Sequence, residues 1–144
     1  MQHDQKCIFC KIASGAVRSR IIKQNERAIV LLDAFPLAAG HSLIIPKLHY
    51  AKLQEMTKQD SQAVFELLQE VTGAIEKASG VDASTIAIHN GKDAGQEIPH
   101  VHVHIIPRKA GDGAGPVHSM FRSRPELKDS EMDLLLGRIK QFIP

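Results

Sequence analysis

The sequence predicts a single α+β domain, in which several short strands form a sheet and helices pack on it. Three observations predict this class: β-branched runs of strand length, one long segment with helical apolar spacing, and turn residues between them. A chain of 144 residues with 43% hydrophobic side chains can bury one sizeable core, but it falls short of two ordinary domains. We expect one domain over residues 1–144, with a core at about 7–108 and a C-terminal loop and helix at 109–144.

The N-terminal third predicts one short helix and three strands. The helix pattern ends at Gly15, and the first two strands are β-branched runs around Asn25 and Glu26, which predicts a hairpin. Pro46 stops the third strand, because proline cannot donate to a strand ladder. The expected elements are a helix at 7–13 and strands at 18–24, 28–32 and 41–45.

A long helix is the clearest local prediction in the remainder of the chain. Thr57 is a candidate N-cap and Gly80 ends the segment, so we expect a helix over 58–79. Its apolar residues at helical spacing are Val64, Leu67, Leu68, Val71 and Ile75. Strands at 85–88 and 101–106, a flexible glycine-rich segment at 109–116 and a final helix at 130–142 complete the prediction, and the sheet is expected to be antiparallel.

Charge and hydropathy exclude two classes of partner. The formal net charge is +2 and the charged residues are scattered, so the chain lacks the concentrated basic face that a nucleic-acid backbone requires. No apolar run approaches the roughly 20 residues that span a bilayer, and the first six residues are polar. We therefore expect a cytoplasmic protein that binds neither nucleic acid nor membrane.

The two cysteines, Cys7 and Cys10, are three residues apart. In a reducing compartment this spacing favours metal binding or redox chemistry over a structural disulfide. Two thiolates supply half of a tetrahedral zinc site, so other ligands must come from elsewhere. Two simply packed or exposed thiols remain an alternative, as does a redox pair, although no predicted strand precedes Cys7 as a thioredoxin-like motif requires.

Three histidines alternate with apolar residues at His100, His102 and His104. Successive strand side chains point to opposite faces, so the imidazoles share one face while Val101 and Val103 pack on the other. Each imidazole has two polar nitrogens that need partners, which favours a chemical site over an exposed edge strand with chance histidines. A nucleophile, an acid or base, and a three-histidine metal site are all open at this point.

A glycine-containing loop precedes this strand, in the sequence Asn90-Gly-Lys-Asp-Ala-Gly-Gln96. Glycines allow backbone N–H groups to approach an anion closely, and amide side chains can donate to phosphate oxygens. The loop therefore predicts a phosphate pocket against the histidine strand. His89 borders this loop as a possible ligand contact or a solvated strand end, and Arg108 fits a solvated rim.

With these motifs the sequence resembles the histidine-triad (HIT) superfamily, in its zinc-containing bacterial-type branch. The resemblance rests on His100-Val-His-Val-His-Ile-Ile, on Gly40-His41-Ser-Leu-Ile-Ile-Pro46-Lys-Leu-His49, on the 90–96 loop and on the Cys-x-x-Cys pair. It covers residues 7–108. It implies a five-stranded antiparallel sheet with two main helices, paired into a homodimer. The long helix also has apolar residues outside its main apolar stripe, namely Ala63, Phe65 and Ala74. A monomer would leave them partly exposed, which is consistent with a homodimer.

The resemblance also implies an activity. His102 would attack the α-phosphate of a purine nucleotide to form a nucleotidyl-histidine, with His104 bonded to the phosphate or leaving oxygen. Implied nucleotide-binding residues are Asp33 on the ribose, His41 behind the triad, and Asn90, Gly95 and Gln96 near the phosphate. The implied substrates are nucleoside phosphoramidates or dinucleoside polyphosphates, cleaved or transferred without a catalytic metal.

Two further points depend on the same resemblance. Cys7, Cys10, His49 and His100 are the implied ligands of a structural zinc. Glu97 departs from the hydroxyl residue that many relatives place beside the glutamine, so the preferred leaving group is open. The competing interpretation is a nucleotide-binding or scaffolding protein with little turnover and a structural zinc.

Overall fold

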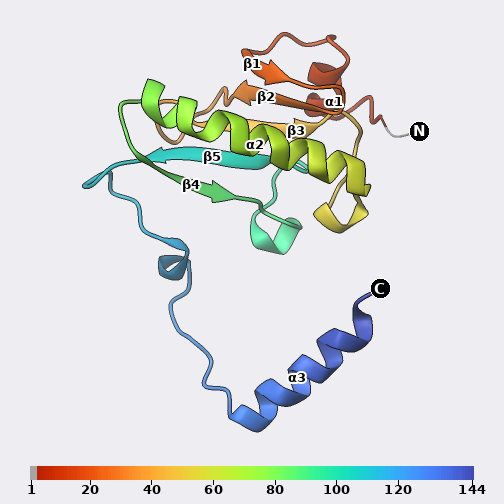
Figure 1. Cartoon of the computed structure of the whole chain (residues 1–144), viewed down its shortest axis with the longest axis vertical. Coiled ribbons are helices and arrows are strands. Elements are labelled where there is room, and N and C mark those ends of the chain that lie inside the picture. The colour runs from red at the N-terminus through yellow and green to blue at the C-terminus, as the bar shows by residue number, and fades with distance from the viewer. Residues whose placement is uncertain (1–2) are drawn as a thin grey trace. The chain divides into compact units, whose positions relative to one another are not determined.

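The computed structural model describes residues 3–144, which form two compact units, one that ends at Asp112 and one at 113–144, each described by itself. The first unit contains a sheet with helices (Figure 1). Its elements are α1 (Ile8–Ala13), β1 (Ile21–Gln24), β2 (Ala28–Leu32), β3 (Ser42–Pro46), α2 (Lys58–Ala78), β4 (Ala83–Ala87) and β5 (Val103–Arg108), with single 3-10 turns η1 (Leu53–Glu55) and η2 (Lys92–Ala94).

The sheet has five strands in the order β1-β2-β3-β5-β4, and every neighbouring pair is antiparallel. This confirms the predicted α+β class and the five-stranded antiparallel sheet. The pairing of β3 with β5 places Leu43 opposite His104 and Ile44 opposite Val103. The histidine strand therefore lies inside the sheet, between β3 and β4.

The two faces of the sheet bury two different clusters. On one face, strand residues such as Val30, Ile44 and Val103 pack against α2, which lies across the sheet in Figure 1. On the other face, Leu43 and the residues that alternate with the first set pack against α1. Because side chains alternate along a strand, His104 shares the α1 face. Phe9 of α1 also contacts the rings of His100 and His102. The face predicted to carry the three histidines is therefore the face that α1 covers.

The observed helix α2 has the predicted N-cap, Thr57, and its range agrees with the predicted range except at the last residue. The Thr57 side chain accepts a hydrogen bond from the Asp60 N–H at 3.1 Å, which satisfies one of the free donors of the first turn. The helix ends at Ala78 rather than at residue 79. Its buried face is formed by Asp60, Ala63, Val64, Leu67, Val71 and Ile75.

Four strands differ in their bounds from the prediction. The strand expected at 41–45 lies at Ser42–Pro46, so Pro46 ends the strand from within it. The strand expected at 101–106 begins at Val103, because the Val101 N–H donates to the Tyr50 carbonyl at 2.7 Å, outside the sheet. The strand expected at 18–24 begins at Ile21, where a bulge interrupts the pairing with β2. The strand expected at 85–88 lies at Ala83–Ala87. His100 and His102 therefore lie in an extended segment just before β5.

The second unit contains a 3-10 turn, η3 (Val117–Met120), and a 14-residue helix, α3 (Asp129–Phe142), close to the predicted 130–142. Its side chains are exposed, including the apolar Leu135, Ile139 and Phe142 that gave the helical pattern. Within residues 3–144, no helix is long and apolar enough to cross a membrane.

Candidate active site and metal centre

A cavity of about 520 Å³ opens on the α1 face of the sheet. This volume is typical of a small-molecule site, and its lining is mostly apolar with a few polar groups, as such sites require. Seven residues singled out in the sequence line it: the predicted site residues Asp33, His41, Gly95, His102 and His104, together with His89 and Glu97. The structure therefore brings the acidic residue, the histidine of β3 and two triad histidines to one cavity.

His102 has one nitrogen committed and one available. Its Nδ1 lies 2.7 Å from the His100 carbonyl oxygen, which can only accept, so Nδ1 carries the proton and donates. Nε2 of the neutral ring then holds a lone pair. Burial lowers the pKa of His102, although the hydrogen bond to the His100 carbonyl opposes this shift. A neutral imidazole with a free Nε2 is the form that a nucleophile requires.

His41 and His104 form a second imidazole pair with a defined tautomer. The Leu37 N–H donates to His41 Nδ1 at 3.0 Å, so His41 carries its proton on Nε2. That Nε2–H donates to His104 Nδ1 at 2.9 Å, which leaves the remaining nitrogen of His104 as a donor. Burial, together with the neighbouring His102 and His41, lowers the pKa of His104 to about 4. Near neutral pH, His104 is therefore an uncharged hydrogen-bond donor.

Asp33 lies at the wall of the cavity with its side chain 17% exposed. One carboxylate oxygen accepts a hydrogen bond from the Phe35 N–H at 2.8 Å, which holds the loop after β2. The other oxygen is 3.5 Å from His41 Nε2. The carboxylate is thus fixed at the cavity and retains capacity to accept hydrogen bonds from a ligand.

The predicted phosphate loop reaches the cavity only in part. Gly95 lines the cavity with a φ of +90°, a left-handed conformation that favours glycine. The Gln96 side chain turns away, since its amide nitrogen donates to the Ala51 and Ile98 carbonyls and its oxygen accepts from Gly91 N–H. Asn90 is likewise bonded to the segment at Leu53 and Gln54. In this structure both amides hold the loop, and neither is among the residues that line the cavity.

Sequence reasoning missed the apolar wall of the cavity. Phe9 of α1 packs on the nucleophilic candidate, with its ring centroid 5.1 Å from that of His102. Phe35, Leu37 and other apolar residues extend the wall, and His89 and Glu97 also line the cavity. The apolar pattern of residues 7–13 was the available signal, but periodicity cannot say which apolar residues face a ligand.

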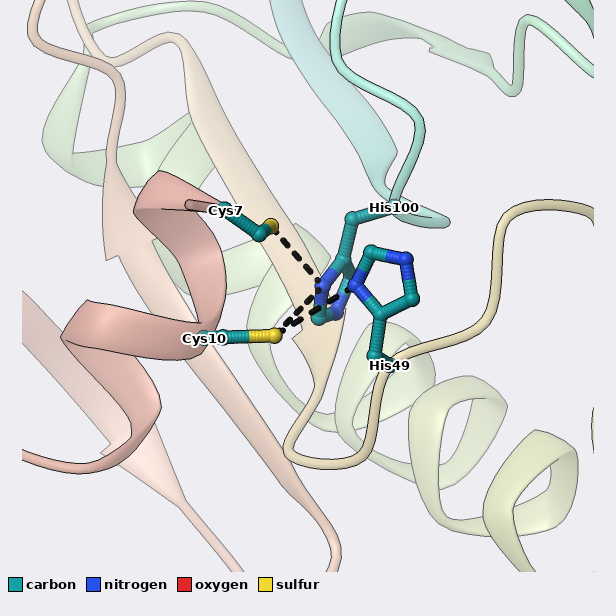
Figure 2. Close-up of side chains that lie close together, drawn as sticks. All are labelled: Cys7, Cys10, His49 and His100. Atoms are coloured by element: carbon teal, nitrogen blue, oxygen red, sulfur yellow. Dashed lines mark hydrogen bonds between the residues drawn. The ribbon is translucent and has the colours of Figure 1, made fainter. Parts of the chain in front are cut away.

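The predicted metal ligands meet in one cluster (Figure 2). Cys7 Sγ lies 3.4 Å from His100 Nδ1, and Cys10 Sγ lies 3.4 Å from His49 Nδ1 and 3.6 Å from His100 Nδ1. In a tetrahedral zinc site, bond lengths of about 2.3 Å to sulfur and 2.0 Å to nitrogen place these atoms about 3.5 Å apart. The three sulfur–nitrogen distances therefore match tetrahedral coordination, and all four donor atoms lie within 4.8 Å of one another.

The orientation of His100 also fits a metal ligand. It is fully buried, and its Nε2 lies 2.9 Å from the Pro46 carbonyl oxygen, so Nε2 carries the proton. Nδ1 then presents a lone pair to the two sulfurs, the arrangement that outer hydrogen bonds give to metal-bound histidines. Burial lowers the pKa of His100 to about 4. The ring is therefore neutral at physiological pH and ready to coordinate.

The comparisons with known proteins identify the class. A family model for the HIT domain matches residues 14–111. The chain therefore belongs to the HIT family, as the motifs predicted. It is 37% identical over 143 residues to the adenylylsulfatase HINT3 of Arabidopsis thaliana, a match that covers 99% of this chain and 71% of that protein.

Two solved structures share the fold. A HIT family protein from Bacillus subtilis is 30% identical, with a TM-score of 0.86 over 97% of this chain and 99% of its own. A zinc-bound histidine triad family protein from Mycobacterium smegmatis is 29% identical, with a TM-score of 0.71 over 94% of this chain and 96% of its own. The similarity thus extends over nearly the whole chain.

Proposed function

We propose that this protein is a hydrolase or nucleotidyl transferase that cleaves purine nucleotides at the α-phosphate through a nucleotidyl group on His102. The observation that carries the proposal is the fixed tautomer of His102, whose Nδ1–H is held by the His100 carbonyl and whose Nε2 has no hydrogen-bond partner within residues 3–144. The similarity to a relative named adenylylsulfatase supports the same reaction class. The proposed substrates are nucleoside phosphoramidates and dinucleoside polyphosphates.

In the proposed first step, His102 Nε2 attacks the α-phosphorus and a phosphorus–nitrogen bond forms. The bond between phosphorus and the leaving nitrogen or oxygen breaks, and the leaving group takes the electron pair and a proton from solvent. The hydrogen bond from His102 Nδ1–H to the His100 carbonyl stabilises the positive charge that develops on the imidazole during the attack. Water or another acceptor then attacks phosphorus and releases His102.

The remaining cavity residues bind and position the nucleotide in this proposal. His104 donates to a phosphate oxygen, because the His41 Nε2–H fixes its tautomer. The Gly95 backbone lies beside the same phosphate, and the apolar wall around Phe9 receives the base. Asn90 and Gln96 support the loop in this structure, and their contact with phosphate requires their amides to exchange partners on binding.

The proposed cofactor is one zinc ion per chain, held by Cys7, Cys10, His49 and His100. The tetrahedral spacing of the donor atoms supports this assignment, as does the zinc-bound relative. Four protein ligands would complete the coordination of the ion, which is the arrangement of structural rather than catalytic zinc. It would tie α1, which carries Phe9 of the cavity wall, to the segment that carries His102.

The deciding assay measures release of AMP from adenosine 5′-phosphoramidate, adenylylsulfate and diadenosine polyphosphates. We expect turnover of at least one substrate, with the ratio of kcat/KM values defining the preferred leaving group. AMP binding without release of AMP from any of the three would instead favour the nucleotide-binding or scaffolding alternative.

Asp33→Ala is expected to raise KM for ribonucleotide substrates by about tenfold and to change kcat less. The reason is that a carboxylate on the ribose hydroxyls contributes equally to ground state and transition state. A 2′-deoxy substrate should lose its disadvantage in the variant. The matched control is Asp93→Ala, an exposed carboxylate outside the cavity lining. Equal discrimination by wild type and Asp33→Ala would remove Asp33 from the ribose site.

The acid limb of the kcat/KM profile is expected to lie below pH 6.5, the ordinary pKa of histidine, because burial lowers the pKa of His102. The neutral nucleophile therefore persists as pH falls through 6.5.

The lowered pKa of His104, about 4, makes the free energy of unfolding depend on pH. Between pH 6.5 and 4 the unfolded chain binds more protons, so stability falls as pH falls. Thermal unfolding at each pH separates the two effects, and a limb at or above pH 6.5 would contradict the assignment.

A homodimer is the expected assembly in solution. Phe65 on α2 is 48% exposed in one chain, and such large apolar groups are commonly covered by a symmetric partner. Light scattering at micromolar concentration should give twice the chain mass of 15.8 kDa. A monomeric mass at that concentration would disprove the dimer.

A further inference from the structure

Asp60 is a buried carboxylate that lies outside the residues lining the cavity. It is 1% exposed in the first turn of α2 and is not among the candidate ligands of the metal cluster. It accepts hydrogen bonds from the Tyr50 hydroxyl at 2.5 Å, the Thr57 hydroxyl at 2.6 Å and Arg27 Nη1 at 2.9 Å. Burying a carboxylate is costly unless such donors compensate it. The three donors compensate the buried carboxylate and link the first turn of α2 to Arg27 and Tyr50.

Tyr50 connects Asp60 to the metal cluster, because its hydroxyl bonds Asp60 and it is the neighbour of His49 in the chain. Tyr50 is itself buried and follows His49 directly in the chain. Its backbone carbonyl accepts the Val101 N–H at 2.7 Å, and Val101 lies between His100 and His102. One tyrosine thus joins the two segments that carry the histidine ligands and the nucleophile.

His49 is the ligand that most needs such support. The His100 ring is oriented by its bond to the Pro46 carbonyl. Among the described residues, the ring of His49 has one hydrogen bond, to Cys10 Sγ. Metal-bound histidines usually have a second partner that fixes the ring. The position of His49 therefore depends on the backbone that Tyr50 anchors.

We propose that Asp60 is a positioning residue which, through Tyr50, holds His49 in register with His100 and His102. The inference rests on the proposed zinc site, and it assigns a role in that site to Asp60, which lies far from the triad in the sequence. Cys7 and Cys10 are set by α1, whose packing on the sheet leaves them little freedom. The histidines must therefore be brought to the sulfurs, and a small displacement of His49 weakens the fourth bond.

Four variants separate positioning from general stability. Asp60→Asn and Tyr50→Phe disrupt the link between Asp60 and Tyr50. Arg27→Met removes another donor to Asp60 while leaving Tyr50 in place, whereas Thr57→Val removes a contact of both Asp60 and Tyr50. For each variant, the measurements are the zinc dissociation constant by chelator competition, the visible spectrum with Co²⁺ in place of zinc, and the melting temperature of the metal-free protein.

We expect Asp60→Asn and Tyr50→Phe to weaken zinc binding by about tenfold or more, in the range that outer-sphere changes produce, and to alter the Co²⁺ spectrum. Arg27→Met should lower the melting temperature but keep zinc affinity within about twofold, and Thr57→Val should weaken zinc binding less than Tyr50→Phe does. Tyr50→Phe decides the result if Asp60→Asn does not fold.

Two different results would overturn the inference. If zinc affinity in all four variants simply follows the loss of stability, Asp60 has a structural role only, and the proposed zinc site stands. If the wild type binds neither zinc nor Co²⁺, the zinc site itself is wrong and the inference falls with it.

Discussion

His102→Ala is expected to abolish turnover while nucleotide binding survives. Without the imidazole no nucleotidyl intermediate can form, so kcat should fall by several orders of magnitude. The proposed binding groups at Asp33, His104 and Gly95 remain in the cavity, so the dissociation constant for AMP should change by less than about tenfold. Single-turnover kinetics and equilibrium binding of AMP measure the two quantities separately.

His118→Ala is the matched control, since it removes an exposed imidazole in the second unit and should leave kcat unchanged. Rapid quenching followed by mass spectrometry should find an acid-sensitive nucleotidyl group on His102 of the wild type. An adduct on His104, or on no residue, would overturn the assignment. So would a His102→Ala enzyme with more than about a tenth of wild-type kcat, a loss below ~1.4 kcal/mol.

The double variant Cys7→Ser, Cys10→Ser is expected to lose zinc and much of its stability. A metal that binds only the native state contributes RT ln(1 + [Zn]/Kd), about 4 kcal/mol when free zinc exceeds Kd a thousandfold. For a chain of this size the melting temperature should then fall by about 10 °C or more. Metal analysis and thermal unfolding with and without chelator give both numbers.

The control for the thiol variant is the wild type stripped of metal, which should melt near the double variant and recover when zinc is restored. The variant should not respond to zinc. A purified wild type that contains no zinc, and whose melting temperature is unchanged by chelator, would contradict the metal assignment.

Short-range periodicity explains what could be predicted about the fold. The helical spacing of Val64, Leu67 and Val71 and the cap at Thr57 predicted α2, because both signals lie within one or two turns. The same reasoning misplaced the start of the histidine strand, since a local pattern cannot report that the Val101 N–H bonds to Tyr50 instead of a strand neighbour. Strand ends depend on partners that lie far along the chain.

The amino-acid sequence was sufficient to predict the α+β class, the common face of the histidines and the family, because alternation and motif spacing are properties of neighbouring residues. The folded chain alone shows which nitrogen of each imidazole carries the proton, through Leu37 N–H at His41 and the His100 carbonyl at His102. It also turned Gln96 toward the Ala51 carbonyl and brought α1 over the cavity. The Gln96 contact joins residues 45 positions apart, whereas the two imidazole contacts join residues four and two positions apart. In both cases the folded backbone decides which groups meet, and no local pattern encodes which partner prevails.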